Sequence, residues 1–508
     1  MRGTGTFWSN GSLVTVLALA ISGCAMDGDI EIDSAQAELI ADPVAFDDAV
    51  EAAAGQVMYQ PSTASQITMA ELKEPSASIT AIGDPLPGTN AAAFAEARDA
   101  FIAEEEIDEG LGPIFNERGC GTCHTTTVVG GSGDQIERRF GRFQSNGTFF
   151  GFDVAPENHG GTLRQLMTNG TFVNGTTTCT IPLEVEPATA TVKNVGRRTT
   201  ALFGLGLMDS MPDAVFPQVQ ATQPASVRGI AQSVAIVLPD VRDPNQRIGS
   251  QRVGRFGWKG LVPSLLVFSG DAYLNEMGIT TQSCVQGQSI LAFANENFPN
   301  NVAPAAGCNG GDLAPPQPAG NGVPTFTDDA VGSCAGGLNE IQDDLVLFRT
   351  FMEHLAPPPR NFSQDSGSVI NAGSQVFQAV GCAGCHVTGT FITPFNPFNG
   401  VPSRFQFQPF GDFMLHDMGS LGDRIGNTND SQFRTRLMRT APLWGARLQR
   451  LMLHDGRVTL ANSGNNVLTM IRNAILAHDG TARTARDNFV FGISPSNQDL
   501  LLRYVRSL

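Results

Sequence analysis

The pentapeptide Cys-X-X-Cys-His occurs twice, as CGTCH from Cys120 to His124 and as CAGCH from Cys382 to His386. Its two thiols can add to the vinyl groups of one haem, and the adjacent histidine can supply an axial nitrogen to the iron. Structural zinc would need a second Cys or His pair close to each string. The neighbouring sequence has none, so we predict a redox protein with two covalently bound haems c, attached at Cys120, Cys123, Cys382 and Cys385, with His124 and His386 as proximal ligands.

The N-terminus has the pattern of an export signal. An apolar run from Leu13 to Ile21, too short to span a bilayer, is followed by small residues. The string ISGC that ends at Cys24 resembles a bacterial lipobox. The resemblance implies that residues 1–23 are a lipoprotein signal peptide and that Cys24 carries a lipid. Ala25 favours the outer membrane, so we expect a lipid-anchored protein on the periplasmic side. An ordinary signal peptide is the alternative.

The composition is acidic. The 508 residues have a formal net charge of −17 and no basic patch, which excludes nucleic acid as an expected partner. An acidic surface would suit a basic electron-donor cytochrome, although acidic exported proteins are common. Asp27 to Glu51 contains many acids and no Lys or Arg. Because such segments rarely form a core, residues 24–90 are predicted to be an acidic flexible tether.

Four further cysteines remain in the predicted mature chain. In an exported protein an even number suggests disulfides, with three pairings open. The pair that brackets a Gly/Pro-rich stretch is our first choice, and buried free thiols are the alternative. The four are Cys179, Cys284, Cys308 and Cys334, and the bracketing pair is Cys308 with Cys334.

Helical periodicity divides the rest of the chain into two parts. Apolar residues at helical spacing begin near Ala91, and Ile341 to Leu355 predicts an amphipathic helix that the following prolines end. We therefore expect an N-terminal haem domain over residues 91–356 and a C-terminal haem domain over 357–508. The first would include a loop-rich insertion, most irregular from Asn295 to Gly337.

The C-terminal part resembles a class I cytochrome c domain. Ser374 to Val380 reads as the helix that delivers the haem cysteines, and Ser494-Pro495 offers an N-cap and a first-turn proline for a closing helix. The predicted fold class is mainly α, with long irregular loops, few short strands and two cytochrome c-like haem domains.

Several strings together resemble the bacterial di-haem oxidoreductase family, whose members are labelled peroxidases or "thiol oxidoreductases". The resemblance covers about residues 92–508 and is more distant to the di-haem cytochrome c peroxidases and the MauG enzymes. The matching strings are GLGPIFNERGCGTCH from Gly110, GRFGWK from Gly254, EMGI from Glu276, HDMG from His416, TAPLWG from Thr440 and HDGR from His454.

The resemblance also implies a second axial ligand for the C-terminal haem. In the peroxidases, a helix after the His-Asp/Ser-Gly turn carries this ligand, and His478 occupies that position here. We expect His386 and His478 to bind this iron, with Met418 as the rival of His478. If they do not bind iron, His478 would be a surface histidine and Met418 a core methionine. The peroxidases also bind calcium between their domains, so a calcium ion is a candidate cofactor, although no compact acidic loop motif is present.

The N-terminal haem has no strong distal ligand in the sequence, since the nearest histidine, His159, lies in a predicted loop. An open sixth position would allow chemistry on peroxide or oxygen, helped by groups that move protons and stabilise charge. The candidate catalytic residues are Arg255, Trp258 and Glu276. Trp258 could instead be a relay between the haems or a core residue, and the other two an ion pair or haem-propionate contacts.

These observations predict an exported di-haem oxidoreductase. Electrons from a periplasmic donor cytochrome would enter at the C-terminal haem and pass to the N-terminal haem, which reduces peroxide. A non-enzymatic electron carrier and an oxygen-activating enzyme similar to rubber oxygenases are the alternatives. Dithiol chemistry gains no support, because both CxxC pairs would be consumed by thioether bonds.

Overall fold

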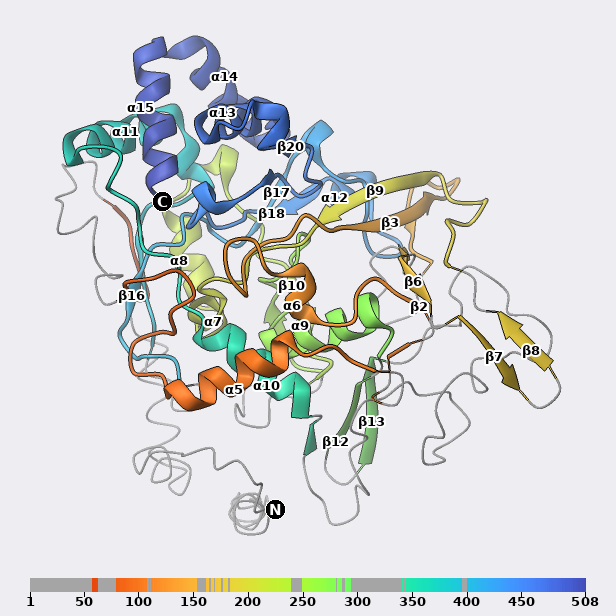
Figure 1. The fold of residues 1–508 in the computed structure, drawn as a ribbon. Coiled ribbons are helices and arrows are strands. Elements are labelled where there is room, and N and C mark those ends of the chain that lie inside the picture. Colours follow the sequence, from red (N-terminus) through yellow and green to blue (C-terminus); the bar gives the residue numbers. More distant parts are fainter. Residues whose placement is uncertain are drawn as a thin grey trace, which may run out of the picture.

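Figure 1 shows the computed structural model of the chain. The predicted signal peptide, Cys24, His159, Cys308 and Cys334 lie outside the described residues, as does nearly all of the predicted insertion. Within the described residues, no helix combines the length and apolarity needed to cross a membrane. The structure describes residues 57–62, 79–106, 109, 111–112, 114–152, 161–163, 166–168, 170–174, 177–180, 183–238, 249–279, 281–285, 288–293, 340–341, 343–394 and 400–508.

Helices supply more of the described structure than strands do. The longer helices are α5 (Ala91–Ile102), α8 (Val215–Thr222), α9 (Leu265–Ala272), α10 (Asp343–His354), α11 (Gly367–Val380), α13 (Val467–Ala477) and α15 (Pro495–Ser507). The shorter ones are α6 (Cys120–Cys123), α7 (Leu205–Asp209), α12 (Gln432–Thr435) and α14 (Arg483–Asp487), and η4 (Tyr273–Met277) is a π-helical turn that continues α9.

The strands are short, as expected, but more numerous than the sequence suggested, because many are pairings of only two or three residues. β3 (Ile136–Phe143) is the centre of one sheet and pairs with β4 (Phe149–Phe150), β5 (Gly161–Leu163) and β9 (Val192–Arg198). Two-stranded pairs join β2 (Ile114–Phe115) to β6 (Met167–Thr168), β7 (Thr171–Asn174) to β8 (Thr177–Thr180), β10 (Ser233–Ala235) to β11 (Gln251–Val253), β17 (Leu415–Asp417) to β18 (Leu437–Arg439), and β19 (Leu451–Met452) to β20 (Val458–Thr459).

Two three-stranded sheets complete the described strands. One joins β13 (Gln288–Phe293), β12 (Thr281–Val285) and β14 (Glu340–Ile341), and the other joins β1 (Tyr59–Gln60), β15 (Thr390–Ile392) and β16 (Gln406–Phe407). Cys179 lies on β8 and Cys284 on β12. The expected disulfides stay predictions.

A pair of packed helices lies beside each haem motif. In the N-terminal part α5 packs on α10, where Phe101 contacts Phe351 at a ring-centroid distance of 4.7 Å. In the C-terminal part α11 packs on α15 (Figure 1). Gly373 permits this crossing, because a Cβ there would lie 2.2 Å from the carbonyl oxygen of Leu500. As predicted, the Ser494 hydroxyl caps α15 by accepting from the amide of Asn497.

The C-terminal part has a buried hydrophobic cluster of its own around α11 and α15, and it shares a larger cluster with the N-terminal part. The domain boundary at residues 356/357 stays a prediction. Phe351 on α10 and Phe407 on β16 belong to the same buried cluster. The tether prediction is wrong for residues 57–62 and 79–90. Tyr59 pairs with Phe391 between β1 and β15, and Met58 and Leu86 are buried. The apolar side chains of these segments can be buried on the folded body.

A buried charge cluster also joins the two parts. Asp423 is fully buried and accepts from the guanidinium of Arg197 at 2.8 Å and from the ammonium of Lys259 at 3.0 Å. Burial alone would raise the pKa of Asp423, but the two cations hold it well below its usual range. The pairing matters because an unpaired buried charge is costly.

Replacing Asp423 with Asn should therefore lower the free energy of unfolding by about 3–5 kcal/mol, since it leaves two buried cations without their anion. Urea unfolding of the full-length protein measures this. Asp134→Asn is the control, because its ion pair with Arg450 is exposed and 3.5 Å long and such pairs contribute little. Similar losses in the two variants would contradict the prediction.

Candidate haem sites

The first motif is one helical turn, α6, packed against the end of α5. A Cβ on Gly121 would lie 2.9 Å from the Cα of Ile102, so only glycine permits this approach. His124 follows as the C-cap, and its ring meets that of Phe101 at 5.9 Å. Burial lowers the pKa of His124 to about 4, so the imidazole is neutral, and its Nδ1 is buried with no hydrogen-bond partner. A neutral imidazole is the form that binds iron.

The second motif follows α11 directly, because Gly381 ends that helix with a φ of +104°. His386 donates from Nδ1 to the carbonyl oxygen of Phe410 at 2.8 Å, which leaves Nε2 for a metal. Burial, with His478 and His416 close by, lowers the pKa of His386 to about 4. This imidazole is also neutral at physiological pH.

The residues of both motifs fit a covalently attached haem. None of the four thiols forms a disulfide. Nδ1 of the neutral His124 ring has no hydrogen-bond partner, and the bond from Nδ1 of His386 to Phe410 leaves Nε2 of that ring for a metal. Burial raises the pKa of the Cys120, Cys123 and Cys382 thiols, which disfavours the thiolate that disulfide exchange requires. Among the described residues, no group of three or more His, Cys, Asp or Glu could hold a separate metal ion. The calcium ion stays a prediction, because calcium also binds backbone carbonyl oxygens and water.

His478 and Met418, the two rival ligands, belong to adjoining segments. His478 is the C-cap of α13, and its Nδ1 donates to the carbonyl oxygen of Ala474 at 2.8 Å, the same arrangement as in His386. Met418 precedes the turn η7 (Gly419–Leu421). The carboxylate of Asp479 accepts from the amide of Ser420 at 2.9 Å and so fixes one segment to the other. The charge of His478 contributes to the lowered pKa of His386, so each histidine acts electrostatically on the other.

Sequence reasoning missed a polar cluster beside the second motif. Asp412 is fully buried and accepts from His416 at 2.8 Å and from Gln223 at 2.6 Å. Although burial alone would lower it, the Asp412 carboxylate raises the pKa of His416 to about 10. Gln223 also donates to the carbonyl oxygen of Gly384, inside the motif. In the sequence, His416 was recognised only as the first residue of the string HDMG. Nothing local in the sequence marks Asp412 or Gln223 as its partners.

Near the first motif, two of the quoted strings come together. A Cβ on Gly112 would lie 2.8 Å from the Cα of Gly278, so the backbones touch. This contact sets η4 beside the segment that leads to Cys120. The side-chain amide of Asn116 then donates to Glu276 at 2.7 Å, and its backbone amide donates to the Glu276 carbonyl oxygen.

Glu276 is the predicted catalytic residue that the structure places at the first motif. Burial, with the charge of Glu137 nearby, raises the pKa of Glu276 to about 7, although the Asn116 bond acts in the opposite direction. After burial, the charges of Glu276 and Glu117 are the causes of the raised pKa of Cys123. A carboxyl group with a pKa near neutrality thus acts electrostatically on Cys123, a predicted haem-attachment residue.

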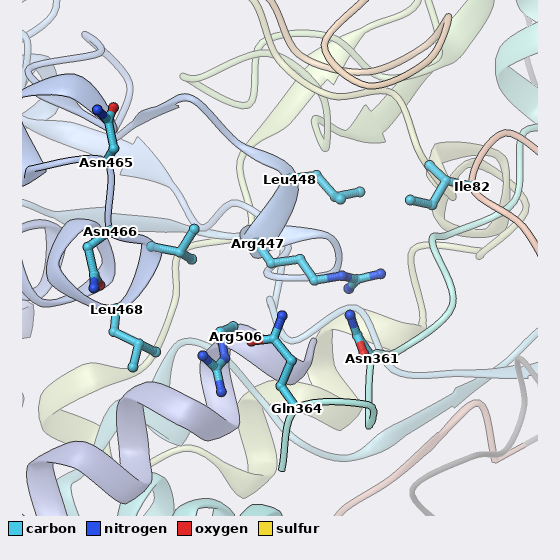
Figure 2. Close-up of a pocket in the computed structure, with 10 residues that line it drawn as sticks. Ile82, Asn361, Gln364, Arg447, Leu448, Asn465, Asn466, Leu468 and Arg506 are labelled. Carbon is cyan, nitrogen blue, oxygen red and sulfur yellow. The ribbon is translucent and has the colours of Figure 1, made fainter.

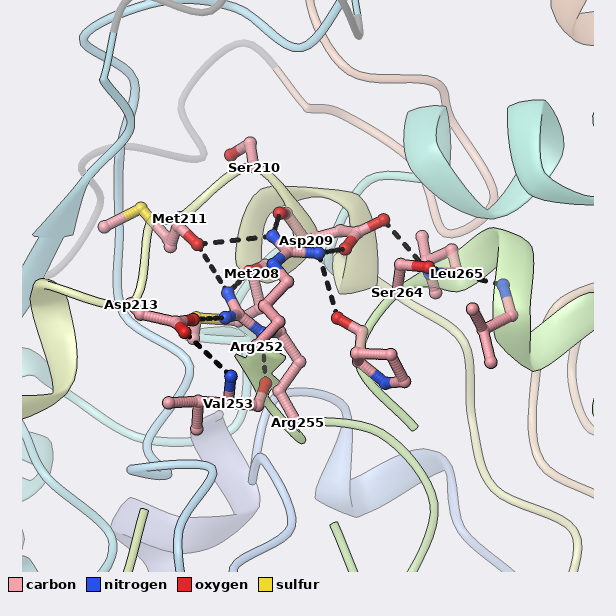
Figure 3. A network of polar contacts seen from close by, with 12 residues as sticks. Met208, Asp209, Ser210, Met211, Asp213, Arg252, Val253, Arg255, Ser264 and Leu265 are labelled. Carbon is pink, nitrogen blue, oxygen red and sulfur yellow. Dashed lines mark hydrogen bonds and ion pairs between the residues drawn. The ribbon is translucent and has the colours of Figure 1, made fainter. Parts of the chain in front are cut away.

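Arg255 has a structural environment, shown in Figure 3. Its side chain is fully buried, donates to the carbonyl oxygens of Met208 and Met211, and pairs with Asp213. It also stands 5.1 Å over the ring of Phe216. Arg255 therefore connects the loop after β11 to α7 and α8. Its pairing with Asp213 corresponds to the ion pair that was the alternative to a catalytic role.

Trp258 is hydrogen-bonded to two strands, β9 and β18. Its indole Nε1 donates to the carbonyl oxygen of Arg198 at 3.0 Å, at the end of β9. Thr199 follows, beside the backbone of Cys123, as the surroundings of Gly133 show. On the other side, the amide of Arg439 in β18 donates to the Trp258 carbonyl oxygen, and β18 pairs with the strand that carries His416.

A protein-family model matches more than half of the chain. The model described as "Di-haem oxidoreductase, putative peroxidase" matches residues 188–508. The chain belongs to this family. The matched range contains the second motif and the residues around it, and the first motif lies before it. No curated protein matches.

Among solved structures, the di-haem oxidoreductase is similar to a chain of Kuenenia stuttgartiensis hydrazine synthase, in a structure determined under xenon pressure. The identity is 12%, the match covers 89% of this chain and 97% of that chain, and the TM-score is 0.32. A likeness at this level carries no argument about function.

A separate pocket of about 490 Å³ lies away from the predicted site residues (Figure 2). It opens where the N-terminus of α13 meets the C-terminus of α15, and Arg447 and Arg506 contribute its cationic groups. The Arg506 guanidinium is paired with Asp365. None of the predicted haem or catalytic residues lines it.

The raised pKa of Glu276 makes stability depend on pH. Below the unfolded value of about 4.5 the carboxyl is protonated in both states, and stability falls as pH rises through the folded value of about 7. Glu276→Gln keeps the neutral form, so it should raise the unfolding temperature more at pH 8 than at pH 5. The exposed Glu96 on α5, changed to Gln, is the control for thermal unfolding of the full-length protein. An equal gain at both pH values would count against a raised pKa.

Proposed function

We propose that this di-haem oxidoreductase reduces peroxide at the first motif, with electrons from a donor cytochrome entering at the second motif. Two covalently attached haems c would supply the redox chemistry, because an iron with an open sixth position can bind peroxide and reduce it. The observation that carries the proposal is Glu276, whose pKa of about 7 and place beside Cys123 suit a proton-transfer group.

The residues around Glu276 support this role. Asn116 donates to Oε2 and so orients the carboxyl group, which leaves Oε1 to take up and release a proton. A pKa near neutrality lets one carboxyl act in both directions during turnover. Arg139 provides a positive charge that acts on Glu276 and opposes the effect of Glu137. Trp258, which is bonded to β9 of the N-terminal part and to β18 of the C-terminal part, suits the relay role.

The histidines support different roles for the two irons. His386 and His478 each donate from Nδ1 to a backbone carbonyl, as a pair of ligands to one iron would, and the charge of His478 acts on His386. Of the other described histidines, His354 contacts Thr89 and His454 packs on Trp258, whereas His416 is bonded to Asp412 and to the thiol of Cys385 at the second motif. This favours electron entry at the second motif and an open position at the first.

We further propose that the chain is exported and anchored on the periplasmic side of the outer membrane by a lipid on Cys24. The support is the lipobox-like string alone. Metabolic labelling with radioactive palmitate should mark the wild-type chain and be lost in Cys24→Ala. Labelling that survives this change would rule the anchor out.

Peroxide turnover tests the function. His124→Ala should abolish turnover and leave the absorption spectrum of the second site nearly intact. Glu276→Gln should lower kcat by about 10²–10⁴-fold without changing either spectrum, because it removes only the proton acceptor. Glu96→Gln should leave turnover unchanged. Full activity in either site variant would reject the assignment, and absence of turnover in the wild type would favour the electron carrier.

Electron paramagnetic resonance tests the ligands. The wild-type protein should show a low-spin signal from the second site and a high-spin ferric signal, as isolated or half-reduced, from the first. His478→Ala should convert the low-spin signal to high spin, and Met418→Ala should leave it unchanged. The reverse result would make Met418 the ligand, and two low-spin signals in both states would mean that both irons are capped.

A further inference from the structure

We propose that Tyr273 is a redox-active residue of the first site, able to give up one electron while its phenolic proton moves to Glu105. This inference rests on the proposed function, in which hydrogen peroxide supplies the oxidising equivalents. It assigns a second role to η4, the π-helical turn that also carries Glu276. Such turns are rare and occur often at functional sites.

The hydrogen bond from Tyr273 is the first support. Tyr273 is 1% exposed, and its hydroxyl donates to Oε1 of Glu105 at 2.8 Å, while Oδ2 of Asp344 lies at 3.3 Å. Glu105 is itself 6% exposed. A phenol that loses an electron becomes a strong acid, so oxidation is easy only where a base can take the proton at once. A carboxylate within hydrogen-bond distance is such a base.

A continuous run of aromatic rings connects Tyr273 to the first motif. Its ring meets that of Phe348 at 5.2 Å, Phe348 meets Phe101 at 6.0 Å, and Phe101 meets His124 at 5.9 Å. After burial, the charge of Glu105 is the largest cause of the raised pKa of Cys120, and that of Asp344 contributes too. The phenol and its carboxylate partner therefore lie near the attachment point of the first haem.

The other two tyrosines of the chain have different partners. The side chain of Thr222 and the backbone of Gly389 act on the pKa of Tyr59, and the side chain of Ser374 acts on that of Tyr504. None of these three groups is a carboxylate that could hold a transferred proton. Tyr504 also belongs to the helix pair of the C-terminal part. The chain thus offers two matched controls for Tyr273.

The step balances in electrons and protons. The O–H bond of Tyr273 breaks, one electron passes to the centre that hydrogen peroxide has oxidised, and the proton passes to Oε1 of Glu105. The products are a neutral tyrosyl radical and a carboxylic acid. One electron from the donor and return of the proton restore the phenol. Peroxide reduction takes two electrons, so Tyr273 would hold one equivalent whenever the donor delivers the second slowly.

Freeze-quench paramagnetic resonance of the holoprotein mixed with hydrogen peroxide, without reductant, tests the proposal. We expect an organic radical signal whose hyperfine structure narrows when the protein is made with ring-deuterated tyrosine, a label that cannot disturb folding. The signal should vanish in Tyr273→Phe and persist in Tyr59→Phe and Tyr504→Phe. A signal that ignores the label, or that survives in Tyr273→Phe, would overturn the assignment.

Glu105→Gln tests the proton transfer, because the amide oxygen can still accept the hydrogen bond but cannot hold the proton. The radical signal should be lost while the haem spectra and peroxide consumption remain. Asp344→Asn, at the longer distance, should keep the signal. An unchanged signal in Glu105→Gln would exclude Glu105 as the acceptor.

A second oxidant separates this proposal from the proposed function. If the wild-type protein consumes no peroxide, the peroxidase function fails, and flash-generated ruthenium(III) tris-bipyridine then provides the one-electron oxidant. We expect the same Tyr273 radical, with the same dependence on Glu105. Peroxide consumption with no tyrosyl radical from either oxidant would overturn the role of Tyr273 alone.

Discussion

The arrangement of the first site depends on the contact between two glycine backbones. Gly112 and Gly278 approach so closely that a side chain on Gly112 would overlap the partner backbone, and Gly278 also has a φ of +70° that favours glycine. The amide of Gly112 donates to the carbonyl oxygen of Met277 at 2.9 Å. This contact holds η4 in a fixed position against the segment before the first motif. Backbone packing therefore places the turn that carries Glu276 and Tyr273, and the bonds to Asn116 and Glu105 orient their side chains.

The two motifs share one arrangement of packed helices but differ in the titratable groups around them. Each motif follows a helix whose aromatic side chain packs on a later helix, Phe101 on Phe351 in one part and Phe377 on Tyr504 in the other. Around the first motif the nearby titratable groups are mainly carboxylates, and around the second they are mainly histidines. Carboxylates suit proton transfer and a histidine pair suits electron transfer, so this difference would separate the two tasks within one molecule.

Local signals in the sequence predicted much of the structure. The helices that begin at Ala91 and Pro495 have clear periodicity or capping residues, and the motifs need only a five-residue string. Glu276 was found through its string; the structure shows its bond to Asn116 and its raised pKa, and its catalytic role stays a prediction. Contacts between distant segments could not be read in this way. They include the charge cluster of Arg197, Lys259 and Asp423, the partners of His416, the bond between Tyr273 and Glu105, and the packing of residues 57–62.

The pairing of β1 with β15 has a consequence for how the chain folds. Tyr59 precedes both motifs, whereas its partner Phe391 follows the second. A chain made from its N-terminus cannot complete this sheet until the last part has been synthesised, and closing so long a loop costs entropy that local helices do not pay. During synthesis, β1 therefore stays unpaired until β15 has been made. Misfolding around the second motif would leave Met58 and Tyr59 without their burial site. A defect in the C-terminal part would thus also disrupt the packing of the N-terminal segment.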